Sequence, residues 1–208
     1  MRAKTGVKLA YKHAFAPAFT SDVLNSYVYF KEGRTIMELL TYNQAYEAQV
    51  VELWNQELFA DPITVHKFRR QALLDDNFDS DLCYVAQEDG KTVGFLLATK
   101  RKFPYLERGT EPERGWINAM FVAGEYQGKG IGTKLLMRAE ADLKARGAKN
   151  ITLAAYSPSY FFPGVDTENY AAGAAFFEKH GYVQGKTSYS MCKDCLLYTS
   201  DAADDMQC

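Results

Sequence analysis

MFVAGEYQGKGIGT, residues 120–133, is the stretch that decides the fold. A short apolar run ends in a loop that carries glycine at positions 128, 130 and 132. Beyond the loop, apolar residues recur every three or four positions, which is the period of a helix with one buried face; they are Ile131, Leu135, Leu136, Ala139 and Leu143. Gly147 then provides the left-handed residue that often ends a helix. The stretch therefore predicts a strand, a glycine-rich loop and an amphipathic helix in succession.

Such a loop is suited to bind a phosphate group. Glycines let several backbone N–H groups converge on an anion and let it approach closely, and the start of a helix adds a partial positive charge. The spacing excludes two common nucleotide loops. The dinucleotide fingerprint needs G-x-G-x-x-G, whereas Gly128, Gly130 and Gly132 are one residue too close. The ATP/GTP loop needs four residues before its Gly-Lys pair, and three separate Gly124 from Gly128.

The run QGKGIG, residues 127–132, instead resembles the Q/R-x-x-G-x-G/A signature of the GCN5-related N-acetyltransferases. A second run, FFEKHGY at residues 176–182, resembles the Y-E-K-x-G-F ending of the same family. The resemblance covers residues 37–191 and implies an α/β fold in which helices flank a central mixed, mostly antiparallel sheet. It also implies direct attack of a neutral amine on the thioester of acetyl-CoA, without an acyl-enzyme and without a metal.

The hydrophobic pattern predicts the other elements in an order that matches this family. Asp89-Gly90 between two β-rich runs is a strong hairpin signal. Residues 101–114 read as a charged linker and residues 156–165 as an aromatic loop that contains proline. Helices are expected at residues 44–59, 64–74 and 170–180. Strands are expected at residues 38–42, 82–87, 92–99, 116–122, 151–155 and 182–191.

The resemblance implies which residues hold acetyl-CoA. In the family, the strand before the loop separates from the strand after the helix, and the pantetheine amides pair with the exposed backbone as an added strand would. Backbone N–H groups of the loop hold the diphosphate, and the amide of Val122 is the candidate to stabilise the oxyanion. The expected cofactor-binding residues are Met120, Phe121, Val122, Gln127, Gly128, Lys129, Gly130, Ile131, Gly132, Thr133 and Asn169.

Two positions that serve proton transfer in relatives are altered here. The glutamate base of some members corresponds to Trp116, and the frequent tyrosine acid corresponds to Phe177. Tyr156, just after a predicted strand, and Tyr170, seven residues before Phe177 and so on nearly the same helix face, are equal candidates for the catalytic acid. Charged loop residues that could replace the base, although such residues are usually only solvated, are Glu107, Glu113, Asp166 and Glu168.

Composition limits the class of protein. A chain of 208 residues with 47% apolar and 14% aromatic residues can bury a substantial core in one domain. The net charge of -2 gives no indication of nucleic acid or a membrane as a partner, and no apolar run approaches the length of a membrane span. Four cysteines without a pair of C-x-x-C motifs predict a reduced cytoplasmic protein. The expected partner is a small-molecule or protein amine.

The two ends of the chain differ from the part between them. Residues 1–36 are basic and lack a strong periodicity, so we expect an extension to a domain of residues 37–194, or translation of an upstream frame. Residues 195–208 look like a sequencing adapter read in frame, and we expect them to be artefactual. Residues 160–166 resemble a loop of relatives that carry two such domains. A homodimer and half of a two-domain protein are therefore both open.

Three functions remain open at this point. The first is an acyl-CoA-dependent N-acyltransferase. The second is a module of the same fold that binds acyl-CoA without turnover, since both proton-transfer positions are altered. The third is an unrelated phosphate-binding α/β domain.

Overall fold

The computed structural model describes residues 2–13, 28–31 and 34–192, and the side chains of residues 37–187. The strands in this part of the chain are β1 (Arg2–His13), β2 (Val28–Lys31), β3 (Arg34–Thr41), β4 (Cys83–Glu88), β5 (Lys91–Thr99), β6 (Arg114–Val122), β7 (Asn150–Leu153), β8 (Val165–Asp166) and β9 (Val183–Cys192). They form one sheet in the order β2-β3-β4-β5-β6-β7-β1-β8, and β9 pairs with β1. Every neighbouring pair is antiparallel except β6 and β7. The mixed, mostly antiparallel sheet predicted from the sequence is confirmed.

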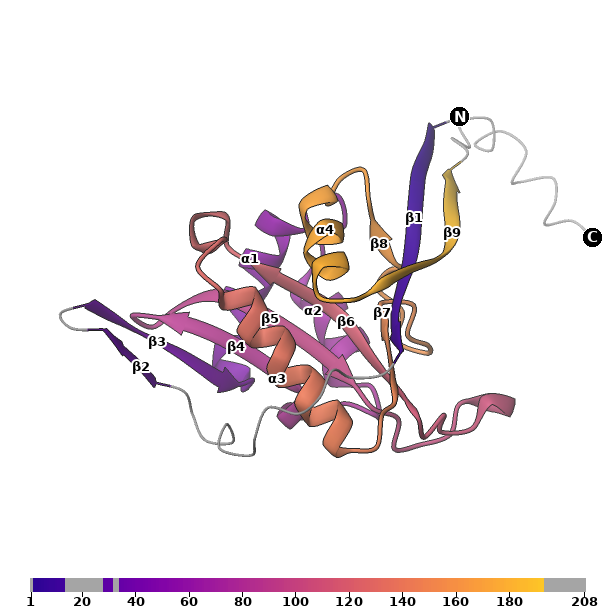
Figure 1. The fold of residues 1–208 in the computed structure, drawn as a ribbon, viewed down its shortest axis with the longest axis horizontal. Helices are drawn as coiled ribbons and strands as arrows, with labels where there is room; N and C mark the ends of the chain where they lie inside the picture. Colours follow the sequence, from indigo (N-terminus) through magenta and orange to yellow (C-terminus); the bar gives the residue numbers. More distant parts are fainter. Residues whose placement is uncertain (1, 14–27, 32–33, 193–208) are drawn as a thin grey trace, which may run out of the picture.

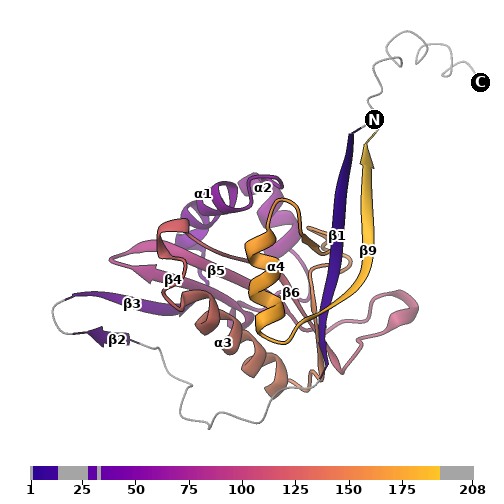
Figure 2. The same cartoon turned by 45° about the horizontal axis from the view of Figure 1, so that its top comes forward.

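Helices cover both faces of this sheet (Figures 1 and 2). One face carries α1 and α2, and the other carries α3 and α4. The apolar positions predicted for the helix after the glycine loop all lie in the core between α3 and the sheet, where Leu135, Ala139 and Leu143 are fully buried. No helix in the described residues is long and apolar enough to cross a membrane. The helices are α1 (Glu47–Glu57), α2 (Val65–Phe68), α3 (Ile131–Ala145) and α4 (Ala171–Lys179).

Local sequence signals explain the turns around the sheet. Asp89 and Gly90 adopt φ values of 50° and 76° and join Glu88 directly to Lys91, so the predicted hairpin is confirmed. Thr64 caps α2 by accepting a hydrogen bond from the Lys67 amide at 3.1 Å. The expected single helix at residues 64–74 instead changes to a π-helical turn at Arg69–Leu73.

The sheet opens between β6 and β7. The two strands pair from Arg114↔Asn150 to Ile117↔Leu153, and the Ala154 amide then donates to the Ile117 carbonyl at 2.7 Å. Ala154 and Ala155 adopt left-handed φ values of 53° and 51°, which turn the chain away from the sheet. The predicted strand at residues 151–155 is therefore too long at its end. β6 continues to Val122, paired with β5 alone.

The first described segment contributes a strand within the sheet. β1 pairs with β7 through Tyr11↔Thr152, and with β9 from Arg2↔Cys192 to Tyr11↔Val183. The domain boundaries expected at residues 37 and 194 stay predictions, and residues 195–208 lie outside the described part of the chain.

We predict that a chain of residues 37–194 folds and binds CoA as tightly as the full chain does. The two core layers and the glycine loop all lie within this range, and what the shorter chain loses is the pairing of β1 with β7, β8 and β9 and of β2 with β3. Thermal unfolding and calorimetry on the two chains check this. A much lower melting temperature for the shorter chain would show that the fold depends on the pairing of β1 with β7 and β9.

Candidate functional site

A cleft of about 580 Å³ lies along the part of β6 that β7 does not cover. Its walls are the end of β6, the glycine loop, the first turn of α3, one side of α4 and the end of α1. Lys129, Ile131 and Asn169 do not line it. The expected cofactor-binding residues that do line it are Met120, Phe121, Val122, Gln127, Gly128, Gly130, Gly132 and Thr133. The end of α1, which precedes the glycine loop in the sequence, and α4, which follows it, thus line the same cleft as the loop.

The glycine loop exposes its backbone to this cleft. Gly128 and Gly130 adopt φ values of 73° and 82°, a region that L residues rarely occupy. No atom lies within 4 Å of a Cβ built on either residue, so the space beside the loop is open. Ile131 begins α3 and is buried, which fixes the loop to the core. Lys129 is exposed, with its Nζ 4.4 Å from the centre of the Tyr126 ring.

The open edge of β6 presents backbone groups to the cleft. In an antiparallel pair, successive residues point their N–H and C=O groups to opposite sides of the strand. The Ala123 amide donates to Val93 on β5 at 2.9 Å, so the groups of Met120 and Val122 point away from β5. The Gln127 side chain donates from Nε2 to the Val122 carbonyl at 3.0 Å from that side. An extended ligand could therefore pair with β6 as an added strand does.

Close packing joins α3 to α4 across the end of the cleft. A Cβ on Gly132 would lie 3.3 Å from the Met120 side chain and 3.5 Å from the Phe176 ring. Phe177, at the position of the family's tyrosine acid, lines the cleft and packs edge-on against Tyr182 at 5.4 Å. A phenyl ring at this position has no proton to donate.

Glu57 is a cleft residue that the sequence did not indicate. Its carboxylate accepts a hydrogen bond from the Gly124 amide at 2.9 Å and another from the Gln127 side chain at 3.4 Å. These contacts fasten the last residue of α1 to the glycine loop. The loop carboxylates considered as substitute bases do not line the cleft. Asp166, for example, accepts hydrogen bonds from the backbone N–H groups of Glu168 and Asn169.

Tyr170 lines the cleft at the start of α4. Its hydroxyl accepts a hydrogen bond from the Ala60 amide at 3.0 Å and donates to Asp61 at 3.3 Å. Burial raises the pKa of Tyr170 to about 12. The hydrogen bond from the Ala60 amide opposes this rise, and the Asp61 carboxylate adds to it. The hydroxyl therefore keeps its proton at neutral pH. The neighbouring Asn169 side chain donates to Asp166 at 2.6 Å.

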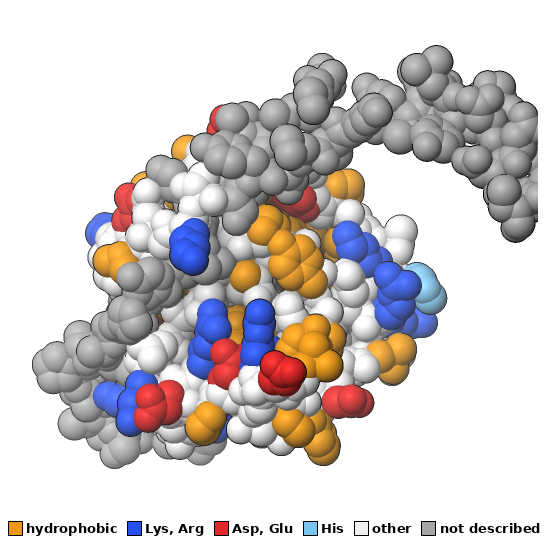
Figure 3. Space-filling model, turned by 90° about the vertical axis from the view of Figure 1, so that its right-hand side faces the viewer, with side chains coloured by type: hydrophobic (Ala, Val, Ile, Leu, Met, Phe, Trp, Pro, Cys, Tyr) orange, Lys and Arg blue, Asp and Glu red, His pale blue; other side chains and the backbone are white. Residues whose placement is uncertain are grey.

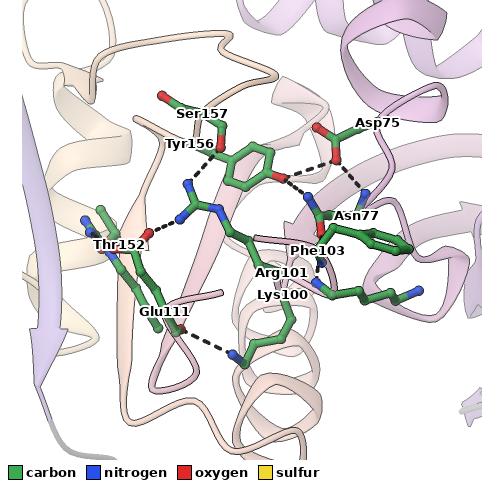
Figure 4. Close-up of polar contacts among 11 residues, drawn as sticks. Asp75, Asn77, Lys100, Arg101, Phe103, Glu111, Thr152, Tyr156 and Ser157 are labelled. Carbon is green, nitrogen blue, oxygen red and sulfur yellow. Dashed lines mark hydrogen bonds and ion pairs between the residues drawn. The ribbon is translucent and has the colours of Figure 1, made fainter. Parts of the chain in front are cut away.

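Tyr156 lies outside the cleft, in a buried polar cluster (Figure 4). Its side chain is 2% exposed, and its hydroxyl accepts from Asn77 at 2.9 Å and donates to Asp75 at 3.1 Å. Burial raises the pKa of Tyr156 above its ordinary range. The structure thus brings one of the two candidate tyrosines to the cleft and places the other in a structural contact.

Arg101 belongs to the same cluster and connects the loop that follows β7 to the loop between β5 and β6 (Figure 4). The guanidinium lies 4.6 Å from the Trp116 ring and 5.6 Å from the Tyr156 ring, donates to the Ser157 carbonyl at 2.8 Å and pairs with Glu111. Burial lowers the pKa of Arg101. Trp116, at the position of the family's glutamate base, is therefore part of a rigid packing unit.

Aromatic side chains cover the space next to this cluster. Phe161 and Phe162 pack on the buried Trp54 ring, with ring centres 5.1 Å and 5.6 Å away. In the linker, Phe103 and Leu106 are 55% and 79% exposed. The right-hand face of the molecule shows apolar side chains exposed among basic and acidic ones (Figure 3).

Comparison with known families identifies the family of the domain. The model of the acetyltransferase (GNAT) family matches residues 42–182, which span the cleft from α1 to the end of α4. The chain belongs to the GNAT family. In the described residues of this GNAT protein, no group of three His, Cys, Asp or Glu side chains is suited to hold a metal.

Named relatives are acetyltransferases of several kinds. An uncharacterized N-acetyltransferase of Archaeoglobus fulgidus is 39% identical over 61 residues, which are 29% of this chain and 40% of that protein. N-alpha-acetyltransferase 30 of Schizosaccharomyces pombe is 25% identical over 154 residues, 74% of this chain and 89% of that one.

Solved structures show the same fold. A GCN5-related N-acetyltransferase from Sphaerobacter thermophilus superposes with a TM-score of 0.57 at 17% identity, covering 89% of this chain and 50% of its own. An aminoglycoside N-acetyltransferase in complex with CoA gives a TM-score of 0.54 at 15% identity, covering 80% and 100%. The chain thus spans half or less of the archaeal relative and of the Sphaerobacter protein.

We predict that Gly130→Asp abolishes CoA binding. The substitution places a side chain and a negative charge where the loop backbone is open to an anion, and aspartate tolerates left-handed φ better than most residues do. Calorimetry with CoA measures the loss, and circular dichroism checks the fold. Unchanged affinity in a folded variant would contradict a phosphate site at this loop.

Proposed function

We propose that this GNAT protein is an N-acetyltransferase that moves the acetyl group of acetyl-CoA to a primary amine by direct attack. The observation that supports this most is the open edge of β6 beside the glycine loop within a single cleft. The described residues fit the cofactor because they offer backbone donors and acceptors for an extended amide arm and converging N–H groups for a diphosphate.

Residues of the chain would contribute to the reaction mainly by position. Met120 and Val122 would hold the pantetheine arm, and residues 128–133 would hold the diphosphate. The bound thioester supplies the acyl carbon that the amine attacks. The Val122 N–H would stabilise the negative charge that develops on the carbonyl oxygen, because it points to the open edge of the strand.

Tyr170 is the group we propose as the proton donor to the leaving thiolate. It lines the cleft, and its raised pKa keeps the hydroxyl protonated at neutral pH. Tyr156 has the same chemistry, but it does not line the cleft. β6 offers no carboxylate that could serve as a base, and the Glu57 carboxylate in the cleft is bonded to the glycine loop. In this proposal the amine therefore arrives neutral or loses its proton to water.

Two classes of amine acceptor remain open, a protein amine and a small-molecule amine. N-alpha-acetyltransferase 30 is a named relative, and the ribosomal-protein-S18-alanine N-acetyltransferase of Escherichia coli has the same fold at 14% identity. The aminoglycoside enzyme is named for a small-molecule acceptor. We propose a cytoplasmic enzyme that acts as a homodimer or as half of a two-domain protein. A module that binds acyl-CoA without turnover is the alternative, favoured by Trp116 and Phe177.

We predict that CoA binds and that at least one class of amine causes thiol release from acetyl-CoA. A panel of small amines and peptides with free N-termini, followed with a thiol reagent, measures this. CoA binding without release across the panel would support the binding module. Failure to bind CoA at all would remove both functions.

We predict that Tyr170→Phe lowers kcat at least tenfold with little change in acetyl-CoA affinity, since general acid catalysis is worth roughly 10²–10⁴-fold. Tyr156→Phe is the matched control. It should keep kcat but lower stability by about 1–3 kcal/mol, because Asn77 and Asp75 lose a buried partner. Steady-state kinetics and thermal melts separate the two effects. Normal kcat in Tyr170→Phe would show that water protonates the thiolate.

A further inference from the structure

Basic side chains gather on α2 and the π-helical turn that follows it. Residues 64–74 contain His66, Lys67, Arg69 and Arg70 and no acidic residue; these four form what we call the α2 surface. Lys67 is half-buried and the other three are exposed. Arg69 pairs with the buried Glu47 at 2.6 Å. At one edge of the face in Figure 3, Lys and Arg side chains lie next to a histidine. In a chain with a net charge of -2, the α2 surface is a local region of positive charge.

The charges of Lys67 and Arg70 are not balanced by a neighbour. Among the described residues, neither side chain takes part in an ion pair. The next carboxylate along the chain, Asp75, accepts a hydrogen bond from Tyr156, so Asp76 is the first exposed carboxylate after the segment. Many other basic side chains of the domain do pair with carboxylates; they are Lys91, Arg101, Lys102, Arg114, Arg138, Arg146 and Lys149. Two cations of the α2 surface are therefore available to an outside anion.

The α2 surface adjoins the cleft through the segment that joins α1 to α2, on one face of the sheet (Figure 2). Phe59 in this segment is 60% exposed, and its ring centre lies 5.6 Å from that of the cleft residue Tyr170. The Tyr170 hydroxyl also bonds to Asp61 in the same segment. On the other side, Gln71, next to Arg70, donates to the Tyr160 carbonyl at 2.9 Å in the aromatic loop. An extended chain that leaves the cleft past Phe59 therefore meets the α2 surface.

We propose that the α2 surface binds an acidic segment of a polypeptide acceptor, downstream of the amine that enters the cleft. This inference rests on the proposed function and selects the protein amine from the two classes of acceptor. Carboxylates of the acceptor lie opposite Lys67 and Arg70, and the residue next to the amine lies on Phe59. Complementary charge at such a surface speeds encounter and selects among partners more than it adds affinity.

Acetyl transfer to three peptides tests the assignment on the full chain. The peptides share the two N-terminal residues of the best peptide substrate and continue with six residues that are acidic, neutral or rich in arginine, which adds charge without a second reactive amine. Eight extended residues span about 26 Å, which lets the peptide continue beyond the cleft. We expect kcat/KM at low salt to be about tenfold higher for the acidic than for the neutral peptide, and salt to remove this preference because it screens exposed charges.

Charge reversal locates the effect on the α2 surface. Lys67→Glu combined with Arg70→Glu should lower the ratio of kcat/KM for the acidic over the neutral peptide by about tenfold, mainly through KM, and should favour the arginine peptide. Lys67→Gln combined with Arg70→Gln should show a smaller loss in the same direction. Lys186→Glu, at an exposed position of β9, is the matched control and should keep the ratio. Thermal melts check that each variant is folded.

Other outcomes overturn the proposal. Equal kcat/KM for the three peptides, or an equal loss of the ratio in Lys186→Glu, would show that the α2 surface does not select the acceptor. Inhibition by a short oligonucleotide, with no preference among the peptides, would assign the surface to nucleic acid. Turnover of small amines without turnover of any peptide would overturn this inference and leave the proposed function in place. No turnover with any acceptor would contradict the proposed function and this inference with it.

Discussion

The separation of β6 from β7 after Ile117 is the constraint on which the cleft depends. It is produced by two consecutive residues, Ala154 and Ala155, in the left-handed region. This conformation costs an L residue roughly 1–2 kcal/mol. Hydrogen bonds from the Ala154 amide to Ile117 and from the Ala155 amide to Phe162 offset part of that cost. Strain of this kind persists only where the surroundings hold it, and here it leaves one strand edge open to a ligand.

Side-chain hydrogen bonds hold the loop that leaves this turn. Tyr156 bonds to residues that follow the π-helical turn, and Arg101 reaches Ser157 from the end of β5. A buried guanidinium is costly without partners, and here three aromatic rings, a carboxylate and a carbonyl surround it. One packing arrangement therefore opens the sheet between β6 and β7 and holds the loop that follows β7.

Much of this fold could be predicted because its signals are local. The glycine loop, the buried face of α3 and the Asp89-Gly90 hairpin each depend on residues close in the sequence, and each is found as predicted. Predictions that depended on distant contacts were less complete. The choice between Tyr156 and Tyr170 depended on where the chain turns at Ala154, and alanines in a β-rich run carry no signal of a left-handed turn.

Side-chain pairing across elements was also outside the reach of the sequence. Glu57 and His180 occupy ordinary positions at helix ends, and only the approach of α1 to the loop and of α4 to α3 gives them cleft contacts. The pairing of β1 with β7 and β9 involves partners far apart in the chain. The alternation of Val7, Leu9 and Tyr11 with Lys8 and Lys12 has the period of a strand, and it is the signal that could have indicated β1. Helix ends and strand order are set by tertiary packing, which periodicity does not encode.

The replacement of the family's base by Trp116 has a physical explanation in Arg101. A carboxylate at position 116 would lie beside a buried guanidinium and form an ion pair with it, which would lower its basicity. An indole at the same position stabilises the cation through its ring face and leaves the charge balance to Glu111. With Arg101 at the end of β5, position 116 can therefore support the loops or supply a base, but it cannot do both. This chain uses the position for support, and in the proposed reaction catalysis would rest on the placement of the amine, the thioester and the Val122 amide.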